Sequence, residues 1–171
     1  VEVGGRRITA PKVIVATGGR PAVPDIPGIQ DAPTLDSTSL LELDRLPESL
    51  IFLGGGYIGV ELAQMMARMG TRVTIVCRSR LLPRTEPEVS RALTETLRAE
   101  GVAVVDGATY DAARRDGARA VLTVTVDGAD RDLTADRLVL TTGRAANTEG
   151  LGLAEMGVET DARGEIRVGD D

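Results

Sequence analysis

Three glycines that follow a short apolar run are the residues of this sequence best suited to binding a phosphate. Gly54, Gly56 and Gly59 are spaced as G-x-G-x-x-G directly after residues 50–53. The first glycine permits a tight turn, the second lets a pyrophosphate approach the backbone, and the third lets a helix pack close to the strand. The N–H groups and the dipole at the start of that helix attract phosphate. The spacing therefore predicts a dinucleotide-binding turn.

The sequence around the glycines predicts the elements that such a turn needs. Residues 50–53 form a buried strand, and residues 57–69 carry apolar side chains at helical spacing up to Gly70. Residues 71–76 then form a second strand, which completes a βαβ unit of about thirty residues. An ordinary glycine-rich turn remains the alternative, because 20 glycines in 171 residues also produce chance matches.

A basic loop after the second predicted strand indicates which dinucleotide would bind. No Asp or Glu occurs between Gly70 and Arg84, and the strand ends at Cys77, where an acidic residue would accept a hydrogen bond from the ribose 2′-hydroxyl of NADH. Arg78, Arg80 and Arg84 follow instead, and guanidinium groups bind a 2′-phosphate. We therefore predict NADPH as the ligand. A solvated basic loop is the alternative.

Composition limits the function classes. The chain has 171 residues, 42% hydrophobic and 27% charged, which is typical of one globular domain. A net charge of −6 argues against a nucleic-acid partner, and no apolar run reaches the ~20 residues of a membrane span. One cysteine and no histidine exclude a disulfide framework and the usual structural zinc site, so we predict no metal site. A lone thiol favours a cytoplasmic location.

The remaining patterns predict an α/β fold: a Rossmann-like parallel sheet of about four strands with flanking helices and a small antiparallel β-meander. The prolines of residues 20–34 predict a linker. Further predicted elements are a hairpin at 1–9, a buried strand at 12–18, a short helix at 37–43, a helix through residue 100 that begins at a capping box in 85–88, a strand at 102–105, a meander within 108–136, a buried strand within 137–144 that ends in glycine, and a strand at 164–168.

Several motifs in this order resemble the pyridine nucleotide–disulfide oxidoreductases, which have two dinucleotide-binding folds. The resemblance covers essentially the whole chain and rests on residues 16–18, the glycine motif with Tyr57 and Glu61, the arginine loop and residues 142–148. Residues 36–43, 61–64 and 107–110 are most similar to the branch of the family that reduces Hg(II) to Hg(0). The resemblance implies three regions: 1–24, the edge of an FAD domain and hinge; 25–145, the NAD(P)H-binding domain; and 146–171, a return segment toward the FAD domain.

The resemblance also implies residue roles. Arg78 and Arg84 would hold the 2′-phosphate, Tyr57 would cover the nicotinamide pocket, and Glu61 would approach the flavin–nicotinamide contact. No catalytic residue is expected in this chain, which lacks a redox-active cysteine pair. The implied NADPH-binding residues are Gly54, Gly56, Tyr57, Ile58, Gly59, Glu61, Arg78, Arg84 and Gly143, and the implied FAD-facing residues are Gly18, Gly143, Arg144 and Asn147.

The chain is therefore expected to be an excised part of a larger enzyme, since Val1 opens in the middle of a hairpin. In that parent, a homodimer, NADPH would reduce FAD held by the protein's own FAD and interface domains, and the part alone would be inactive. One alternative is the same domain of a glutathione-reductase-like or dihydrolipoamide-dehydrogenase-like enzyme. The other is a stand-alone nucleotide-binding module. An excised domain should expose apolar surface where FAD would lie, and a stand-alone module should not.

Overall fold

The chain divides into two compact units in a computed structural model that describes residues 1–169. The larger unit is Pro21–Arg144, and the smaller one combines Val1–Arg20 with the segment that starts at Ala145. Their assignment to NAD(P)H and FAD stays a prediction, and residues 170 and 171 of the predicted return segment lie outside the described residues.

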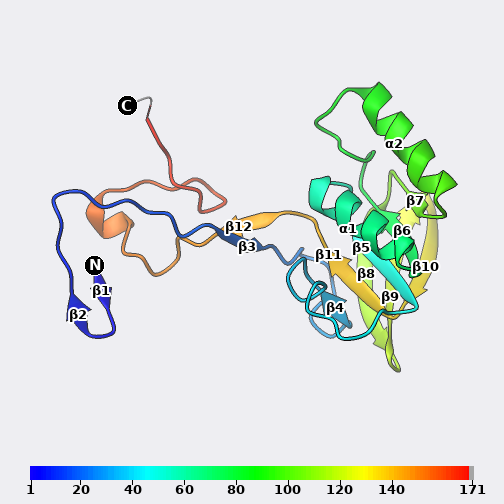
Figure 1. Ribbon diagram of the computed structural model, residues 1–171, viewed down its shortest axis with the longest axis horizontal. Coiled ribbons are helices and arrows are strands. Elements are labelled where there is room, and N and C mark those ends of the chain that lie inside the picture. Colours follow the sequence, from blue (N-terminus) through cyan, green and yellow to red (C-terminus); the bar gives the residue numbers. More distant parts are fainter. Residues whose placement is uncertain (170–171) are drawn as a thin grey trace. The chain divides into compact units, whose positions relative to one another are not determined.

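A parallel sheet forms the centre of the larger unit (Figure 1). Its neighbouring strands pair in the order β4-β11-β5-β6-β7, each pair parallel, so the α/β prediction is confirmed with one strand more than the four expected. The extra strand is the short β4. The strands are β4 (Thr34–Leu35), β5 (Ser49–Leu53), β6 (Arg72–Val76), β7 (Ala103–Val105) and β11 (Arg137–Leu140).

Two different layers cover the two faces of this sheet. On one face lie α1 (Tyr57–Arg68) and α2 (Pro87–Ala99). On the other lies the predicted meander, a three-stranded antiparallel sheet. Its strands are β8 (Thr109–Asp116), β9 (Arg119–Val126) and β10 (Ala129–Ala135).

The sequence of β5 explains the three layers. Successive side chains of a strand point to opposite faces, and all five residues of β5 are buried. Leu50 and Phe52 belong to the apolar cluster shared with the helices, whereas Ile51 and Leu53 belong to the cluster shared with the antiparallel sheet. A strand that is buried on both faces has consecutive apolar residues in its sequence, as β5 has at residues 50–53.

The strand order creates a crevice next to β5. The chain passes from β5 outward through β6 to β7, and then returns to place β11 on the opposite side of β5. Ligands bind at such a reversal of strand order, beyond the carboxyl ends of the strands. The glycine turn follows β5 directly, so it lies at this crevice.

Two local predictions in the larger unit are wrong. The helix predicted at 37–43 is instead a run of turns over 37–42. The Asp36 carboxylate accepts hydrogen bonds from the backbone N–H groups of Thr38 and Ser39, as a helix N-cap does. A single helical i→i+4 bond follows in this segment, from the N–H of Leu40 to the carbonyl of Asp36, so the helix does not continue past its first turn. The capping box before α2 does not form either. The hydroxyl of Thr85 donates to the carbonyl of Leu82, and Glu86 becomes the N-cap residue without a side-chain cap.

In the smaller unit the predicted hairpin is confirmed, with β1 (Glu2–Val3) antiparallel to β2 (Arg6–Arg7). The predicted buried strand at 12–18 is wrong. Those residues are exposed and in no strand, and Ile14 is 90% exposed, because no described strand pairs with them. The strand expected at 164–168 is reduced to one bridge between Thr160 and Ile166. Two short strands, β3 (Gly19–Pro21) where the chain enters the larger unit and β12 (Arg144–Ala146) where it leaves, pair with each other.

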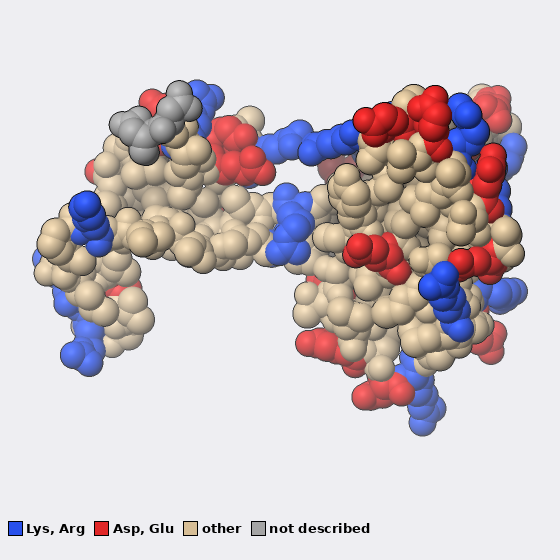
Figure 2. Space-filling view, turned by 45° about the horizontal axis from the view of Figure 1, so that its top comes forward, with Lys and Arg blue, Asp and Glu red and all other residues tan. Residues whose placement is uncertain are grey.

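The surface carries both charge signs. Figure 2 shows acidic and basic side chains interspersed over the visible face of the larger unit, the right-hand body of that view. No helix among residues 1–169 is long and apolar enough to cross a membrane.

Candidate functional site

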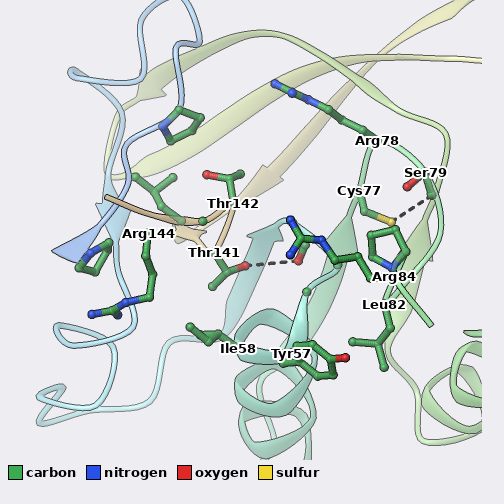
Figure 3. Close-up of a pocket in the computed structure, with 18 of the residues that line it drawn as sticks. Tyr57, Ile58, Cys77, Arg78, Ser79, Leu82, Arg84, Thr141, Thr142 and Arg144 are labelled. Carbon is green, nitrogen blue, oxygen red and sulfur yellow. Dashed lines mark hydrogen bonds between the residues drawn. The ribbon is translucent and has the colours of Figure 1, made fainter. Parts of the chain in front are cut away.

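A pocket of about 770 Å³ opens at the carboxyl ends of β5, β6 and β11, entirely within the larger unit (Figure 3). This volume lies within the range of small-molecule sites. Three stretches supply most of its lining: the glycine turn with the start of α1, most of residues 77–84, and residues 140–144. The fold thus joins motifs that are up to 90 residues apart, since 144 − 54 = 90.

Gly54 and Gly59 have no room for a side chain. Gly54 has φ +110°, and a Cβ there would lie 2.6 Å from the backbone oxygen of Thr141. A Cβ on Gly59 would overlap the carbonyl oxygen of Gly54 and lie 2.7 Å from Oγ1 of Thr141. These two glycines therefore bring α1, β5 and the end of β11 into close contact.

Gly56 is different, because a Cβ at this position would meet nothing within 4 Å. It is the N-cap of α1 and lines the pocket, and no side chain caps the helix. The first N–H groups of a helix have no intrahelical acceptor, and the helix dipole adds positive potential there. The open space in front of Gly56 therefore suits an anion, and the site fits a pyrophosphate.

Thr141 closes the back of the glycine turn and was not singled out in the sequence. Its Oγ1 donates to the carbonyl of Leu53 at 2.8 Å and lies 3.3 Å from that of Gly54. Its backbone N–H also donates to Leu53. A threonine directly after a buried strand gives no such signal by itself, because the contact depends on β11 pairing with β5.

The arginine loop lines the pocket beside the glycine turn, because the backbone N–H of Leu82 donates to the carbonyl of Gly55 at 2.7 Å. Figure 3 shows Arg78 and Arg84 extending from the segment after β6. Arg80 is half-buried rather than simply solvated: its Nη2 donates to the carbonyls of Pro83 and Thr85 at 3.2 and 2.7 Å. Its Nε is buried without a partner among the described residues. Arg80 thus fixes the fold of the loop that presents Arg84.

The charge of the pocket is opposite to that of the chain. The net charge is −6, yet Asp25 is the one carboxylate among the described residues that line the pocket. Four arginines line it, Arg78, Arg80, Arg84 and Arg144. This local positive potential favours a phosphate-bearing ligand.

The other predicted site residues fall into two groups. Tyr57, 63% exposed, and Ile58 both line the pocket, and in Figure 3 Ile58 lies on the side of Arg144 whereas Tyr57 lies on the side of Leu82. Glu61 is exposed in the second turn of α1 and does not line the pocket.

The predicted FAD-facing residues Gly18 and Asn147 belong to the smaller unit. The backbone N–H of Asn147 donates to the carbonyl of Gly18 at 3.0 Å, and its side-chain amide donates to Thr17 at 3.0 Å. Arg20 donates to the Asn147 side chain at 3.2 Å. These contacts join the two chain segments of the smaller unit.

The environment of Cys77 makes its thiol unreactive. It is 3% exposed at the end of β6, and its Sγ donates to the carbonyl of Ser79 at 3.3 Å. Burial raises the pKa of this thiol to about 11, and the charge of Asp106 acts in the same direction. Cys77 thus acts as a small apolar residue after a strand, as buried cysteines usually do.

We expect Cys77 of the folded chain to react at least ~100-fold more slowly with a neutral aryl disulfide at pH 8 than the unfolded chain does, because the thiolate is the reactive form. Stopped-flow thiol titration with and without denaturant measures both rates. The free energy of unfolding should also fall between pH 9 and 11, where the unfolded chain loses the thiol proton and the folded chain keeps it. Equal labelling rates would contradict this assignment.

The glycine turn, the uncapped helix and the crevice beside β5 define a nucleotide-binding α/β domain. The chain belongs to a family whose model, described as pyridine nucleotide-disulphide oxidoreductase, matches residues 1–171. Among curated proteins it is similar to the mercuric reductase of Streptomyces lividans, 43% identical over 165 residues, and to that of Bacillus cereus, 42% identical over 171 residues.

Solved structures agree with this membership. The HOCl-induced flavoprotein disulfide reductase RclA of Escherichia coli superposes with a TM-score of 0.80 at 36% identity, covering 90% of this chain and 35% of that one. An engineered water-forming NADPH oxidase bound to NADPH, a variant of an enzyme from Lactobacillus brevis, gives 0.74 at 25% identity and covers 90% and 34%.

The curated relatives are much longer than this chain. The alignments cover 96% and 99% of the chain but 35% and 27% of the Streptomyces lividans and Bacillus cereus proteins. The chain thus spans about a third of the length of the relatives it matches.

Proposed function

We propose that the larger unit is the NADPH-binding domain of a flavoprotein oxidoreductase. One observation carries the proposal: the uncapped N-terminus of α1 and two arginines, Arg78 and Arg84, line the same pocket. The helix end suits a pyrophosphate, and the guanidinium groups suit a further phosphate. NADPH has both groups, whereas NADH lacks the second.

The engineered NADPH oxidase supports the choice of NADPH. Its substitutions replace an aspartate by alanine, introduce arginine and serine at the next two positions, and add a second arginine six positions after the first. The oxidase from Lactobacillus brevis that it derives from is bound to NADH. This chain has the same order and spacing in Cys77, Arg78, Ser79 and Arg84. In that engineered protein, binding of NADPH therefore goes together with a pair of arginines and with the loss of the aspartate directly before the first of them.

The proposal gives each lining segment one task. The backbone N–H groups at the start of α1 hold the pyrophosphate, and Arg78 and Arg84 hold the 2′-phosphate of the adenosine ribose. Tyr57 covers the nicotinamide half of the pocket, and Gly143 lets the chain pass close to it. When both cofactors are bound, NADPH supplies a hydride and FAD accepts it. This domain binds and orients, and Glu61 is assigned to the side of α1 that approaches the flavin.

For the whole protein we propose reduction of Hg(II) to Hg(0), in the cytoplasm and as a homodimer. The support is the identity of about 40% to proteins named mercuric reductase. The partners would be the protein's own FAD and interface domains. The exposure of Val13, Ile14 and Val15 in the smaller unit supports a covering by further protein. Measuring Hg(II)-dependent oxidation of NADPH by the whole protein tests this step.

A disulfide substrate is the second candidate, because RclA is named a flavoprotein disulfide reductase and is 36% identical. Oxidised glutathione or lipoamide in the same assay separates the two. Faster oxidation of NADPH with a disulfide than with Hg(II) would favour the second candidate.

Calorimetric titration of the chain with NADPH and NADH tests the cofactor assignment. We expect NADPH to bind at least ~10-fold more tightly, and Arg78→Ala to remove most of that preference, because a hydrogen bond to a charged group contributes ~1.5–3 kcal/mol. Arg115→Ala is the matched control, since Arg115 is exposed on β8 outside the pocket lining. Equal affinities for the two nucleotides would overturn the assignment.

A further inference from the structure

Tyr110 of β8 contacts the arginine loop from the opposite layer of the fold. Its ring is 9% exposed and lines the pocket, and the guanidinium carbon of Arg78 lies 5.4 Å from the ring centroid. A guanidinium group over an aromatic face at this distance is attracted by the ring quadrupole. None of the ion pairs among residues 1–169 involves Arg78.

The ring is itself anchored to the glycine turn. The Tyr110 hydroxyl donates to the carbonyl of Val76 at 2.8 Å, and the same carbonyl accepts the backbone N–H of Gly54 at 2.8 Å. Burial raises the pKa of the Tyr110 phenol, so the hydroxyl stays protonated and remains a donor at neutral pH. The end of β6 thus connects the ring to the turn that receives the pyrophosphate.

The backbone before Tyr110 is fastened to the same loop. The N–H of Ala108 donates to the carbonyl of Cys77 at 3.0 Å, and the N–H of Gly107 donates to that of Ser79 at 3.1 Å. These bonds bracket Arg78 on both sides along the chain. The start of the antiparallel sheet therefore holds both the ring and the arginine backbone in fixed relation.

We propose that Tyr110 is a positioning residue that holds Arg78 extended over the pocket before the ligand arrives, and so helps to set the preference for a 2′-phosphate. Arginine loses much side-chain entropy when it is ordered. A ring that orders it in the free protein removes part of that cost from binding. This inference rests on the proposed NADPH site, and it assigns the specificity of that site partly to a residue that touches no phosphate.

The test compares adenosine 2′,5′-bisphosphate with adenosine 5′-monophosphate, both titrated by calorimetry into the chain. We expect Tyr110→Leu to weaken binding of the bisphosphate about three- to tenfold and to leave the monophosphate unchanged. Tyr110→Phe, which keeps the ring face, should retain most of the preference. In an Arg78→Ala background, Tyr110→Leu should have no further effect, because the two residues act as one unit.

Each result is decisive. If Tyr110→Leu weakens both nucleotides alike, or adds its full effect to Arg78→Ala, the ring acts structurally and the proposal is wrong. If the unaltered chain does not distinguish the two nucleotides, the NADPH assignment itself fails.

A measurement on the unaltered chain serves if Tyr110→Leu does not fold. The Nε–H resonance of Arg78, identified by its loss in Arg78→Lys, should be shifted upfield by the ring current in the absence of nucleotide. A resonance at the position of a solvated arginine would overturn the proposal.

Discussion

Gly59→Ala is expected to lower the free energy of unfolding by about 2–4 kcal/mol, a large effect for one methyl group. The new Cβ would overlap the carbonyl oxygen of Gly54 and lie 2.7 Å from Oγ1 of Thr141. Neither atom can move away easily. The carbonyl oxygen of Gly54 belongs to the backbone directly after the fully buried strand β5, and the Thr141 hydroxyl is hydrogen-bonded to the carbonyl of Leu53. Urea unfolding followed by circular dichroism measures the loss.

Gly56→Ala is the matched control, since its methyl group would meet nothing within 4 Å. Its φ of −79° and ψ of 178° suit alanine. We expect stability to change by less than ~0.5 kcal/mol, while NADPH and NADH both bind at least ~10-fold more weakly, because the methyl would occupy the space in front of the helix N-terminus. Equal destabilisation by the two substitutions would contradict the separation of packing and binding roles.

The second large effect is expected from Arg78→Ala combined with Arg84→Ala. Two charge-assisted contacts should be lost together, so NADPH affinity should fall by ~100-fold or more while NADH affinity changes little. The two arginines lie six positions apart in a loop whose fold is held by Arg80, which the double variant keeps.

Salt dependence gives this prediction a second readout. Binding of NADPH to the unaltered chain should weaken more steeply with ionic strength than binding of NADH, because exposed charge pairs are screened by salt. In the double variant the two slopes should coincide. A steep NADPH slope that survives the double substitution would place the 2′-phosphate elsewhere in the pocket.

The sequence predicted the parallel sheet, both helices and the meander, because each has a strong local pattern. β5 is an uninterrupted apolar run, α1 has apolar residues at helical spacing up to Gly70, and β9 alternates apolar and polar residues up to the turn at Asp127–Gly128. The errors arose where local signals competed or partners were not described. The segment 37–43 has the N-cap that the sequence suggested at Asp36 but forms only one helical hydrogen bond after it, and the apolar residues 13–15 suggested burial although no described strand covers them.

In the candidate site, too, the residues with a local sequence pattern were predicted and those that depend on tertiary contacts were not. The glycines and arginines were found because their spacing carries a mechanism. Thr141 and Tyr110 were not, because their importance depends on contacts between β11 and β5 and between β8 and β6, which no local pattern encodes. The resemblance had already singled out residues 107–110, which include Tyr110, but it assigned this tyrosine no role in the site.

The return of the chain to β5 also sets an order of events during synthesis. β5, β6 and β7 with their helices occupy a continuous stretch, Ser49–Val105, and can pair as soon as that stretch leaves the ribosome. The glycine turn must wait for Thr141, because its back is closed by that hydroxyl. Until then the carbonyl of Leu53 lacks the two hydrogen bonds that Thr141 donates, and a nascent chain has no complete nucleotide site. A dinucleotide that stabilises the native state can therefore favour only the last step of folding, in which Thr141 completes the site, and not the earlier pairing of β5, β6 and β7.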